Sequence, residues 1–180
     1  MKKIKKALIS ISNKKNLYLL LKNLAKFKIQ LISSGGTYKE IKKLGFKCQE
    51  ISKYTGSPEI LGGRVKTLHP KIHAGILNKR NNKSHQKDLI KNNFEKIDLV
   101  IVNFYPFEKT LESTNNHNKI IENIDVGGPT MVRAAAKNYN DVTVITNSKQ
   151  YNELIKELNS NKGSTSLDFR QKMSEEAFNE

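Results

Sequence analysis

The stretch QLISSGGTYKEIKKLG, residues 30–45, decides the fold of this chain. Its apolar start, QLI, predicts the end of a strand, and the segment YKEIKKLG predicts a short helix that Gly45 closes. A Gly-Gly turn between the two points the first backbone N–H groups of the helix toward one place. The stretch therefore indicates a βα unit with room for an anion at its turn. An ordinary βα turn with Thr37 as the helix cap has the same pattern.

Apolar runs and amphipathic segments alternate along the rest of the chain. Strands are expected at residues 6–12, 28–33, 46–51, 71–77, 97–104 and 141–146. Helices are expected at about 14–27, 37–44, about 83–93, 128–138, 148–159 and from 167 to the end. This alternation predicts an α/β fold with a parallel sheet and helices on both faces. The length of 180 residues suits one domain, and the polar segments 111–119 and 159–166 are expected to be loops.

The segment GRVKTLHP, residues 63–70, concentrates cationic and hydroxyl side chains next to a pair of glycines. Arg64, Lys66 and Thr67 could surround the same oxygens of an anionic ligand. A solvated basic loop would have the same composition, and the segment alone leaves both interpretations open. His69 and His73 are four residues apart, but Pro70 disfavours a helix between them and no HExxH glutamate is present. We therefore expect no metal site.

Two further segments point to the same chemistry. In NIDVGGPTMVRAAAKN, residues 123–138, Pro129 marks a helix start beside Asp125. The alternative is a buried alanine-rich helix whose Arg133 and Lys137 only extend to solvent. In VNFYPF, residues 102–107, an aromatic turn follows the strongest predicted strand, and ligands of open α/β sheets bind at such carboxyl ends.

Composition limits the class of protein. The formal charge of +15 suggests a nucleic-acid partner, but no basic recognition helix accompanies it, and a bias toward A/T-rich codons would also produce many lysines. We expect no nucleic-acid partner. The single Cys48 excludes an internal disulfide and is typical of a reducing cytosol, so a cytoplasmic location is expected. Cys48 itself is expected in a strand as a buried thiol, and no segment reaches transmembrane length.

In order and spacing, these segments resemble the IMP cyclohydrolase domain of the AICAR transformylase/IMP cyclohydrolase family. The resemblance runs from KALISISNK through LISSGGT, TGSPEILGGRVKTLHPKIHAGIL, DLVIVNFYPFEKT and IENIDVGGPTMVRAAAKN to DVTVITNSKQY. Asn13 stands where the family usually has an acidic residue, and Ser34 also departs from the usual glycine loop.

The resemblance implies a methylglyoxal-synthase-like α/β fold over residues 1–180, with about 160–180 as a helix that leads toward a transformylase domain. It implies closure of the purine ring of formyl-AICAR (FAICAR) to IMP and water, with no metal or redox cofactor. The expected partners are this nucleotide and a second copy of the chain in a homodimer, without nucleic acid or membrane. The alternatives are methylglyoxal synthase, whose SGPxGGD-type block does not match here, and a non-catalytic phosphate-binding regulatory module.

The resemblance also implies the site residues. Asp125 and Lys137 would shuttle the proton, Lys66 and Tyr105 would orient the formyl group, and Asn103 and Phe104 would line the base pocket. The catalytic residues are thus Lys66, Tyr105, Asp125 and Lys137. The substrate-binding residues are Ser12, Asn13, Lys14, Ser34, Gly35, Gly36, Thr37, Arg64, Val65, Thr67, Asn103, Phe104, Val126 and Gly127.

Overall fold

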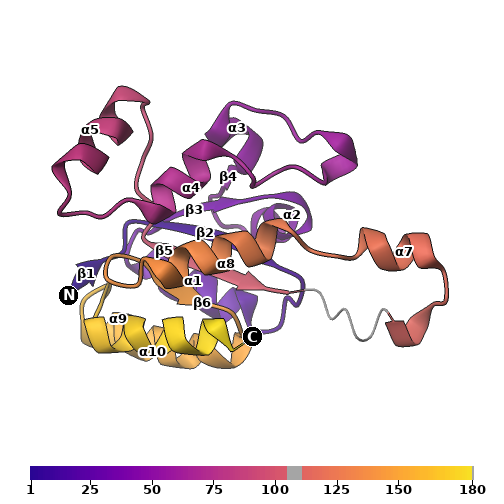
Figure 1. Ribbon diagram of the computed structural model, residues 1–180. Helices are drawn as coiled ribbons and strands as arrows, with labels where there is room; N and C mark the ends of the chain where they lie inside the picture. Colours follow the sequence, from indigo (N-terminus) through magenta and orange to yellow (C-terminus); the bar gives the residue numbers. More distant parts are fainter. Residues whose placement is uncertain (105–110, 180) are drawn as a thin grey trace.

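A five-stranded parallel sheet forms the centre of the computed structural model, which describes residues 1–104 and 111–179 (Figure 1). Its strands, in spatial order, are β4 (Gln49–Glu50), β3 (Gln30–Ser33), β2 (Lys6–Ile11), β5 (Leu99–Asn103) and β6 (Thr143–Ile145). Leu8, in the central strand, pairs with Ile32 of β3 and Val100 of β5. The predicted α/β class and the parallel sheet are confirmed.

The sheet is parallel and covered because its strands are apolar throughout. In β2 every residue is buried except Ser10, which is half-buried, and in β5 the first four residues are buried. A strand with no polar face is stable only between two layers of helices. Burial of these runs therefore requires the helices on both faces that the alternation predicts.

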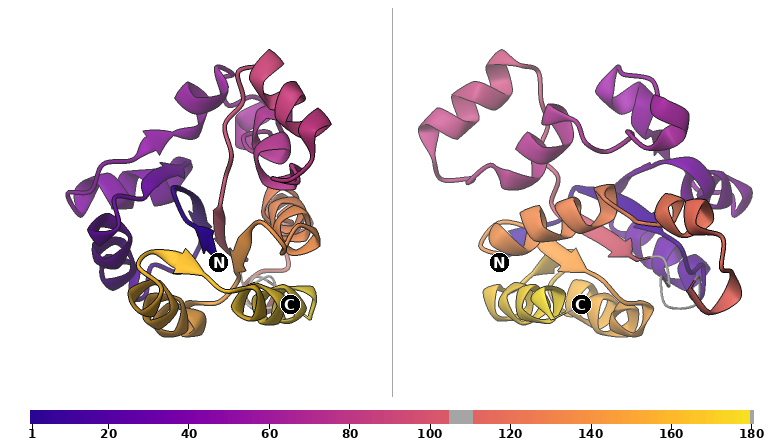
Figure 2. Two further views of the ribbon diagram at one scale, coloured as in Figure 1. Left: turned by 90° about the vertical axis from the view of Figure 1, so that its left-hand side faces the viewer. Right: turned by 45° about the vertical axis from the view of Figure 1, so that its right-hand side comes forward.

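The described part of the chain supplies these layers with helices of two sizes. The longer ones are α1 (Leu17–Lys26), α2 (Gly35–Lys43), α4 (Pro70–Leu77), α5 (Lys83–Lys91), α8 (Gly127–Lys137), α9 (Tyr151–Ser160) and α10 (Leu167–Phe178). The shorter ones are α3 (Ile51–Thr55), α7 (His117–Glu122) and the 3-10 turns η1 (Leu61–Gly63) and η2 (Ser148–Gln150). Helices α1 and α2 lie on one side of the sheet and α4 and α8 on the other (Figure 2). Right-handed crossovers outward from β2 in both directions produce this division.

The strand expected at 71–77 is wrong, because this segment forms helix α4. Pro70 takes the first helical position, where its missing N–H costs nothing, and the Nδ1 of His69 accepts a hydrogen bond from the N–H of Lys71 at 3.1 Å. Ile72 and Ile76, four residues apart, are both buried. A short apolar run of this length fits a strand or a buried helix equally well, so its periodicity could not decide.

Three further expectations need correction at their boundaries. The strand expected at 46–51 shrinks to β4, because the chain turns directly into α3, and Cys48 is a half-buried residue ahead of it. The segment 111–119 is not wholly a loop, because the side chain of Asn116 caps α7 by accepting from the N–H of Lys119. The segment 159–166 contains strand β7 (Ser164–Thr165), which pairs antiparallel with β1 (Lys2–Lys3) near the N-terminus.

The other expected helices and strands are present, with ends shifted by at most three residues. Within residues 1–104 and 111–179, none of the helices combines the length and apolar character that a membrane crossing requires.

Candidate functional site

A cleft of about 670 Å³ opens where β2, β3 and β5 end, at the carboxyl edge of the sheet. Five segments distant in sequence form its walls: the end of β2, the start of α2, the loop around η1, the end of β5, and the stretch from the end of α7 to the start of α8. The predicted residues that line it are Ser12, Lys14, Ser34, Gly35, Gly36, Thr37, Arg64, Lys66, Thr67, Asn103, Asp125, Val126 and Gly127. The fold thus brings most of the predicted site together.

The turn between β3 and α2 forms an anion-binding wall. Ser34 is extended at the helix start, and Gly35 takes a φ of 51° that favours glycine. The first N–H groups of a helix have no partner inside the helix, so those of Gly35 and Gly36 are available to a ligand at the cleft. Together with the positive end of the helix dipole, they suit a phosphate.

Thr37 lines the cleft and forms hydrogen bonds within the protein. Its side chain is buried, and its Oγ1 donates to the carbonyl of Ile11 at 2.9 Å and accepts from the N–H of Ile11 at 3.1 Å. The same oxygen accepts from the Nζ of Lys14 at 3.0 Å, and Lys14 also donates to the Ile11 carbonyl. The threonine therefore ties α2 to the end of β2 and holds the lysine ammonium at the cleft.

The environment of Lys14 also affects its charge. Burial lowers the pKa of the Lys14 ammonium below its ordinary value, and the nearby Glu40 carboxylate opposes this shift. An anion bound at the cleft would favour the charged form further.

Lys66 is held between two glycines. A Cβ on Gly63 would lie 2.8 Å from Cε of Lys66, and a Cβ on Gly35 would lie 3.5 Å from its Nζ. The Nζ also forms an ion pair of 3.2 Å with Glu59, which was not predicted. The glycines next to the GRVKTLHP segment thus leave space for the lysine, and Glu59 fixes the position of its charge.

Arg64 forms an ion pair with Glu122, a second carboxylate that was not predicted. Its guanidinium donates to both carboxylate oxygens of Glu122 at the end of α7, from Nε at 3.2 Å and from a terminal nitrogen. This hydrogen bonding lowers the pKa of the Glu122 carboxyl. Both side chains are well exposed at the mouth of the cleft. An anionic ligand would therefore compete with Glu122 for the arginine.

The start of α8 positions Asp125 against the cleft. The Oδ1 of Asp125 accepts a hydrogen bond of 3.0 Å from the N–H of Gly128. A Cβ on Gly128 would overlap the other carboxylate oxygen, and a Cβ on Gly127 would lie 2.5 Å from Oγ1 of the buried Thr67. The two glycines are thus required for the close approach of the carboxylate and of the threonine.

Asn103 joins the ends of β2 and β5. Its Oδ1 accepts from the N–H of Ser12 at 2.7 Å, from the Ser12 hydroxyl at 2.9 Å and from the N–H of Asn13 at 3.0 Å. The Ser12 hydroxyl also lies 2.7 Å from the carbonyl of Phe104. Asn103 therefore shapes the floor of the cleft, while the Phe104 side chain packs against the core rather than lining the cleft.

Four other predicted residues lie away from the cleft or outside the description. Lys137 is exposed in the last turn of α8, at the opposite end of that helix from Asp125. Val65 pairs with Ile60 in a short bridge, and the Oδ1 of Asn13 caps the N–H of Lys15. Tyr105 lies outside the described residues. The roles of these four residues stay predictions.

The described residues hold no group of three or more His, Cys, Asp or Glu side chains suited to a metal ion. The Nδ1 of His69 accepts from the N–H of Lys71, and its Nε2 lies 3.2 Å from the hydroxyl of Ser57, so both ring nitrogens have hydrogen-bond partners. Burial lowers the pKa of His73, which favours its neutral form.

The fold and the cleft define an α/β protein with a parallel sheet, glycine turns and cationic side chains that converge on an anion-binding cleft. The chain belongs to the family of the MGS-like domain, whose model matches residues 16–130. A second model, described as AICARFT/IMPCHase bienzyme, matches residues 135–180. The chain is 51% identical over 174 residues to the bifunctional purine biosynthesis protein PurH of Rippkaea orientalis. The aligned residues are 96% of this chain and 34% of the relative.

A second relative with the same name is similarly close to this chain. The PurH protein of Persephonella marina is 49% identical over 174 residues, which are 97% of this chain and 34% of the relative. The chain thus spans about one third of the length of the curated relatives it matches. Among solved structures, the crystal structure of ForH superposes with a TM-score of 0.85 at 30% identity, covering 98% of this chain and 92% of that one.

Proposed function

We propose that the cleft at the carboxyl edge is an IMP cyclohydrolase site that closes the ring of FAICAR to give IMP and water. The observation that carries the proposal is the meeting of Lys66, Asp125 and the N-termini of α2 and α8 at one cleft. The similarity to bifunctional purine biosynthesis proteins and to the AICARFT/IMPCHase bienzyme model supports this choice.

The 5′-phosphate of the nucleotide binds at the start of α2. There the free N–H groups of Gly35 and Gly36 and the ammonium of Lys14 supply donors, and Arg64 adds a planar guanidinium when it leaves Glu122. Fixing the phosphate at this wall directs the rest of the nucleotide toward the start of α8.

Ring closure joins the carboxamide nitrogen to the formyl carbon, and the formyl oxygen leaves as water. The carboxamide nitrogen loses one proton as the new bond forms, and the formamide nitrogen loses a second as its double bond to the same carbon forms. The departing oxygen gains both protons. The carboxylate of Asp125 is the base that takes a proton from the carboxamide nitrogen, and the ammonium of Lys66 donates to the formyl oxygen. Backbone N–H groups at the start of α8 stabilise negative charge on that oxygen as the bond forms.

The resemblance assigns part of this shuttle to Lys137. Of Lys66 and Lys137, only Lys66 lines the cleft of the same chain. We therefore assign the donation of a proton to the formyl oxygen to Lys66. Lys137→Ala tests the assignment: turnover close to that of the unchanged protein supports Lys66 alone, whereas a loss of about 10²-fold or more would restore Lys137 to the mechanism.

The proposed activity is tested by mixing the protein with FAICAR and following the absorbance of IMP. Asp125→Asn and Lys66→Met should each lower turnover by about 10²–10⁴-fold, whereas Lys43→Gln, at the distant end of α2, should not. Conversion of dihydroxyacetone phosphate to methylglyoxal would favour the synthase instead. Tight IMP binding without turnover of FAICAR would favour the regulatory module.

We further propose that the protein acts as a homodimer in the cytoplasm. Apolar side chains are exposed around the mouth of the cleft, on η1 and on the segment from α7 to α8, as a subunit contact would require. They are Ile60, Leu61, Ile121, Ile124 and Val126. Sedimentation of the unchanged protein and of Leu61→Ser with Val126→Ser should give a dimer and a monomer, respectively.

A further inference from the structure

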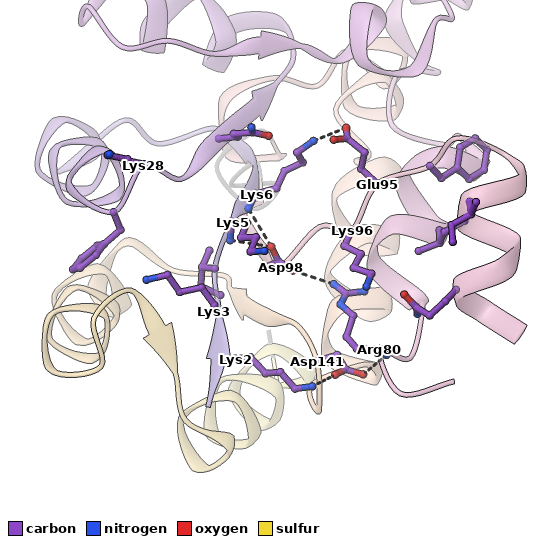
Figure 3. A pocket seen from close by; sticks show the side chains of 17 residues that line it. Lys2, Lys3, Lys5, Lys6, Lys28, Arg80, Glu95, Lys96, Asp98 and Asp141 are labelled. Atoms are coloured by element: carbon purple, nitrogen blue, oxygen red, sulfur yellow. Dashed lines mark hydrogen bonds and ion pairs between the residues drawn. The ribbon is translucent and has the colours of Figure 1, made fainter. Parts of the chain in front are cut away.

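A second cavity, of about 830 Å³, lies at the opposite edge of the sheet, where β2, β3, β5 and β6 begin (Figure 3). It is separate from the carboxyl-edge cleft, and none of its lining residues also lines that cleft. We refer to it as the amino-edge cavity. Cationic residues outnumber acidic ones in its walls.

Each carboxylate of the amino-edge cavity is already paired. Glu95 holds the buried ammonium of Lys6 at 2.5 Å, and Asp141 forms an ion pair of 2.6 Å with Lys2. Asp98 accepts from the N–H groups of Lys5 and Lys6 at 2.9 and 3.1 Å. Arg80 contacts both aspartates, with its guanidinium 3.3 Å from Asp98 and its N–H 3.0 Å from Asp141.

These pairs, and a hydrogen bond from Lys3 to the carbonyl of Lys162, leave three lysine ammonium groups without a partner. The side chains of Lys5, Lys28 and Lys96 are exposed, and none makes a hydrogen bond or ion pair within the described part of the chain. Figure 3 shows Lys28 and Lys96 on opposite sides of the cavity, with Lys5 between them. Uncompensated positive charge thus remains along one line across the cavity.

Strand order sets the arrangement of this line. Lys28 lies in the turn that leads into β3, Lys96 lies in the segment that leads into β5, and these two strands pair with β2 on either side. The two outer lysines therefore flank β2. Their flexible stems allow the ammonium groups to move closer together or farther apart.

We propose that the amino-edge cavity binds a linear oligophosphate, either free or as part of a nucleotide. A chain of two or more phosphates places successive negative charges along a line, which matches two lysines on opposite sides of the cavity with a third between them, whereas a single phosphate presents its charge at one point. Lysine suits this ligand because each ammonium is a point charge with rotatable donors. The cavity volume lies in the range of small-molecule sites.

Apolar residues distinguish this cavity from an ordinary solvated lysine cluster. Ile4, Leu89 and Phe94 lie among the lysines in its walls, and Ile90 of α5 is 80% exposed beside them. An apolar floor keeps water from screening the bound charges as fully as on an open surface. It also offers a contact for a nucleobase if the phosphates belong to a nucleotide.

The proposal is tested by titrating the unchanged protein with inorganic tripolyphosphate and with ATP at physiological salt. Lys5→Gln, Lys28→Asn and Lys96→Gln together should weaken tripolyphosphate binding by about 10- to 100-fold. The asparagine is chosen because Lys28 has a φ of 57°, which asparagine tolerates. The matched control is Lys22→Gln, Lys43→Gln and Lys47→Gln, which removes equal charge from exposed lysines outside both cavities.

Equal weakening in the two triple variants would overturn the proposal, because the binding would then reflect only net charge. Tighter binding of polyglutamate than of tripolyphosphate would also overturn it, in favour of an acidic protein partner. Tighter binding of ATP than of tripolyphosphate would identify a nucleotide as the source of the phosphates, and equal binding would identify the phosphate chain alone.

A second measurement needs no variant. Acetylation of lysines in the unchanged protein, mapped by mass spectrometry, should be slowed by tripolyphosphate at Lys5, Lys28 and Lys96 and unaltered at Lys43. Protection at all four lysines, or at none, would contradict the proposal. Saturating IMP should leave the protection unchanged, so failure here is distinct from failure of the cyclohydrolase proposal.

Discussion

Gly128→Ala should inactivate the carboxyl-edge cleft without unfolding the protein. Gly128 is the second residue of α8, and its N–H donates to the Oδ1 of Asp125. A methyl group there would overlap the other carboxylate oxygen and would lie 3.1 Å from the carboxyl carbon and 3.2 Å from Cγ1 of Val102. Since Val102 belongs to the sheet, the carboxylate is the group that must move.

The size of the effect follows from this displacement. Carbon atoms in contact are about 3.5–4.0 Å apart, so the Asp125 carboxyl carbon must move by about half an ångström and the overlapping oxygen by more. A displacement of about 1 Å in a catalytic group lowers turnover by about 10²-fold. Alanine has a higher helix propensity than glycine, which offsets part of the strain, so the free energy of unfolding should change by less than about 1 kcal/mol.

The assay compares turnover of FAICAR and urea unfolding in Gly128→Ala, Asp125→Ala and the double variant. If the glycine acts only through the carboxylate, adding Gly128→Ala to Asp125→Ala should change turnover by no more than about twofold. Unaltered turnover in Gly128→Ala would refute the reasoning. So would a loss of about 10²-fold in each single variant with a further 10²-fold loss in the double variant, because the two effects would then be independent.

Three other changes test separate parts of the structure. Glu122→Gln should free Arg64 and strengthen IMP binding, measured by calorimetry, by less than about tenfold. The gain in affinity should decrease as the salt concentration rises. Weaker binding of IMP would show that Glu122 assists the ligand instead. Thr37→Val should lower the free energy of unfolding in urea by about 1–3 kcal/mol, because the backbone N–H and carbonyl of Ile11 lose a buried partner, and unaltered stability would contradict that role. Cys48 should react slowly with iodoacetamide at pH 8, because burial raises the pKa of its thiol to about 11. The thiol of the unfolded chain ionises at a lower pH than the buried thiol. The contribution of the buried thiol to the free energy of unfolding should therefore be full below pH 9.0 and decline as pH rises toward 11. The unfolding temperature of Cys48→Ala should depend less on pH across that range than that of the unchanged protein.

Local sequence patterns determined the main elements of this protein. The apolar runs of β2, β3 and β5 can be buried only as inner strands, and the glycine turns before α2 and α8 predict helix N-termini at one edge of the sheet. Parallel strands end at the same edge, so residues from distant turns, such as Gly35 and Asp125, are predicted at a common cleft, and both line it.

Tertiary structure alone decided the features that depend on contacts between distant segments. Helix α4 forms because Ile72 and Ile76 are buried together, and the apolar run itself fits either structure. The pairing of Glu122 with Arg64 joins residues 58 positions apart, and no spacing rule predicts it. Lys137 lies in the motif of α8, yet the helix points it away from the cleft, because a helix rises about 1.5 Å per residue and carries its last turn far from its first.

The same reason explains the amino-edge cavity. Lys5, Lys28 and Lys96 are unremarkable among the lysines of the chain, and only the pairing of β3 and β5 with β2 brings them to one cavity. Sequence patterns fix which residues are buried within an element, because burial follows a local period. Which charges remain unpaired depends on how the elements meet, and that is a property of the folded chain.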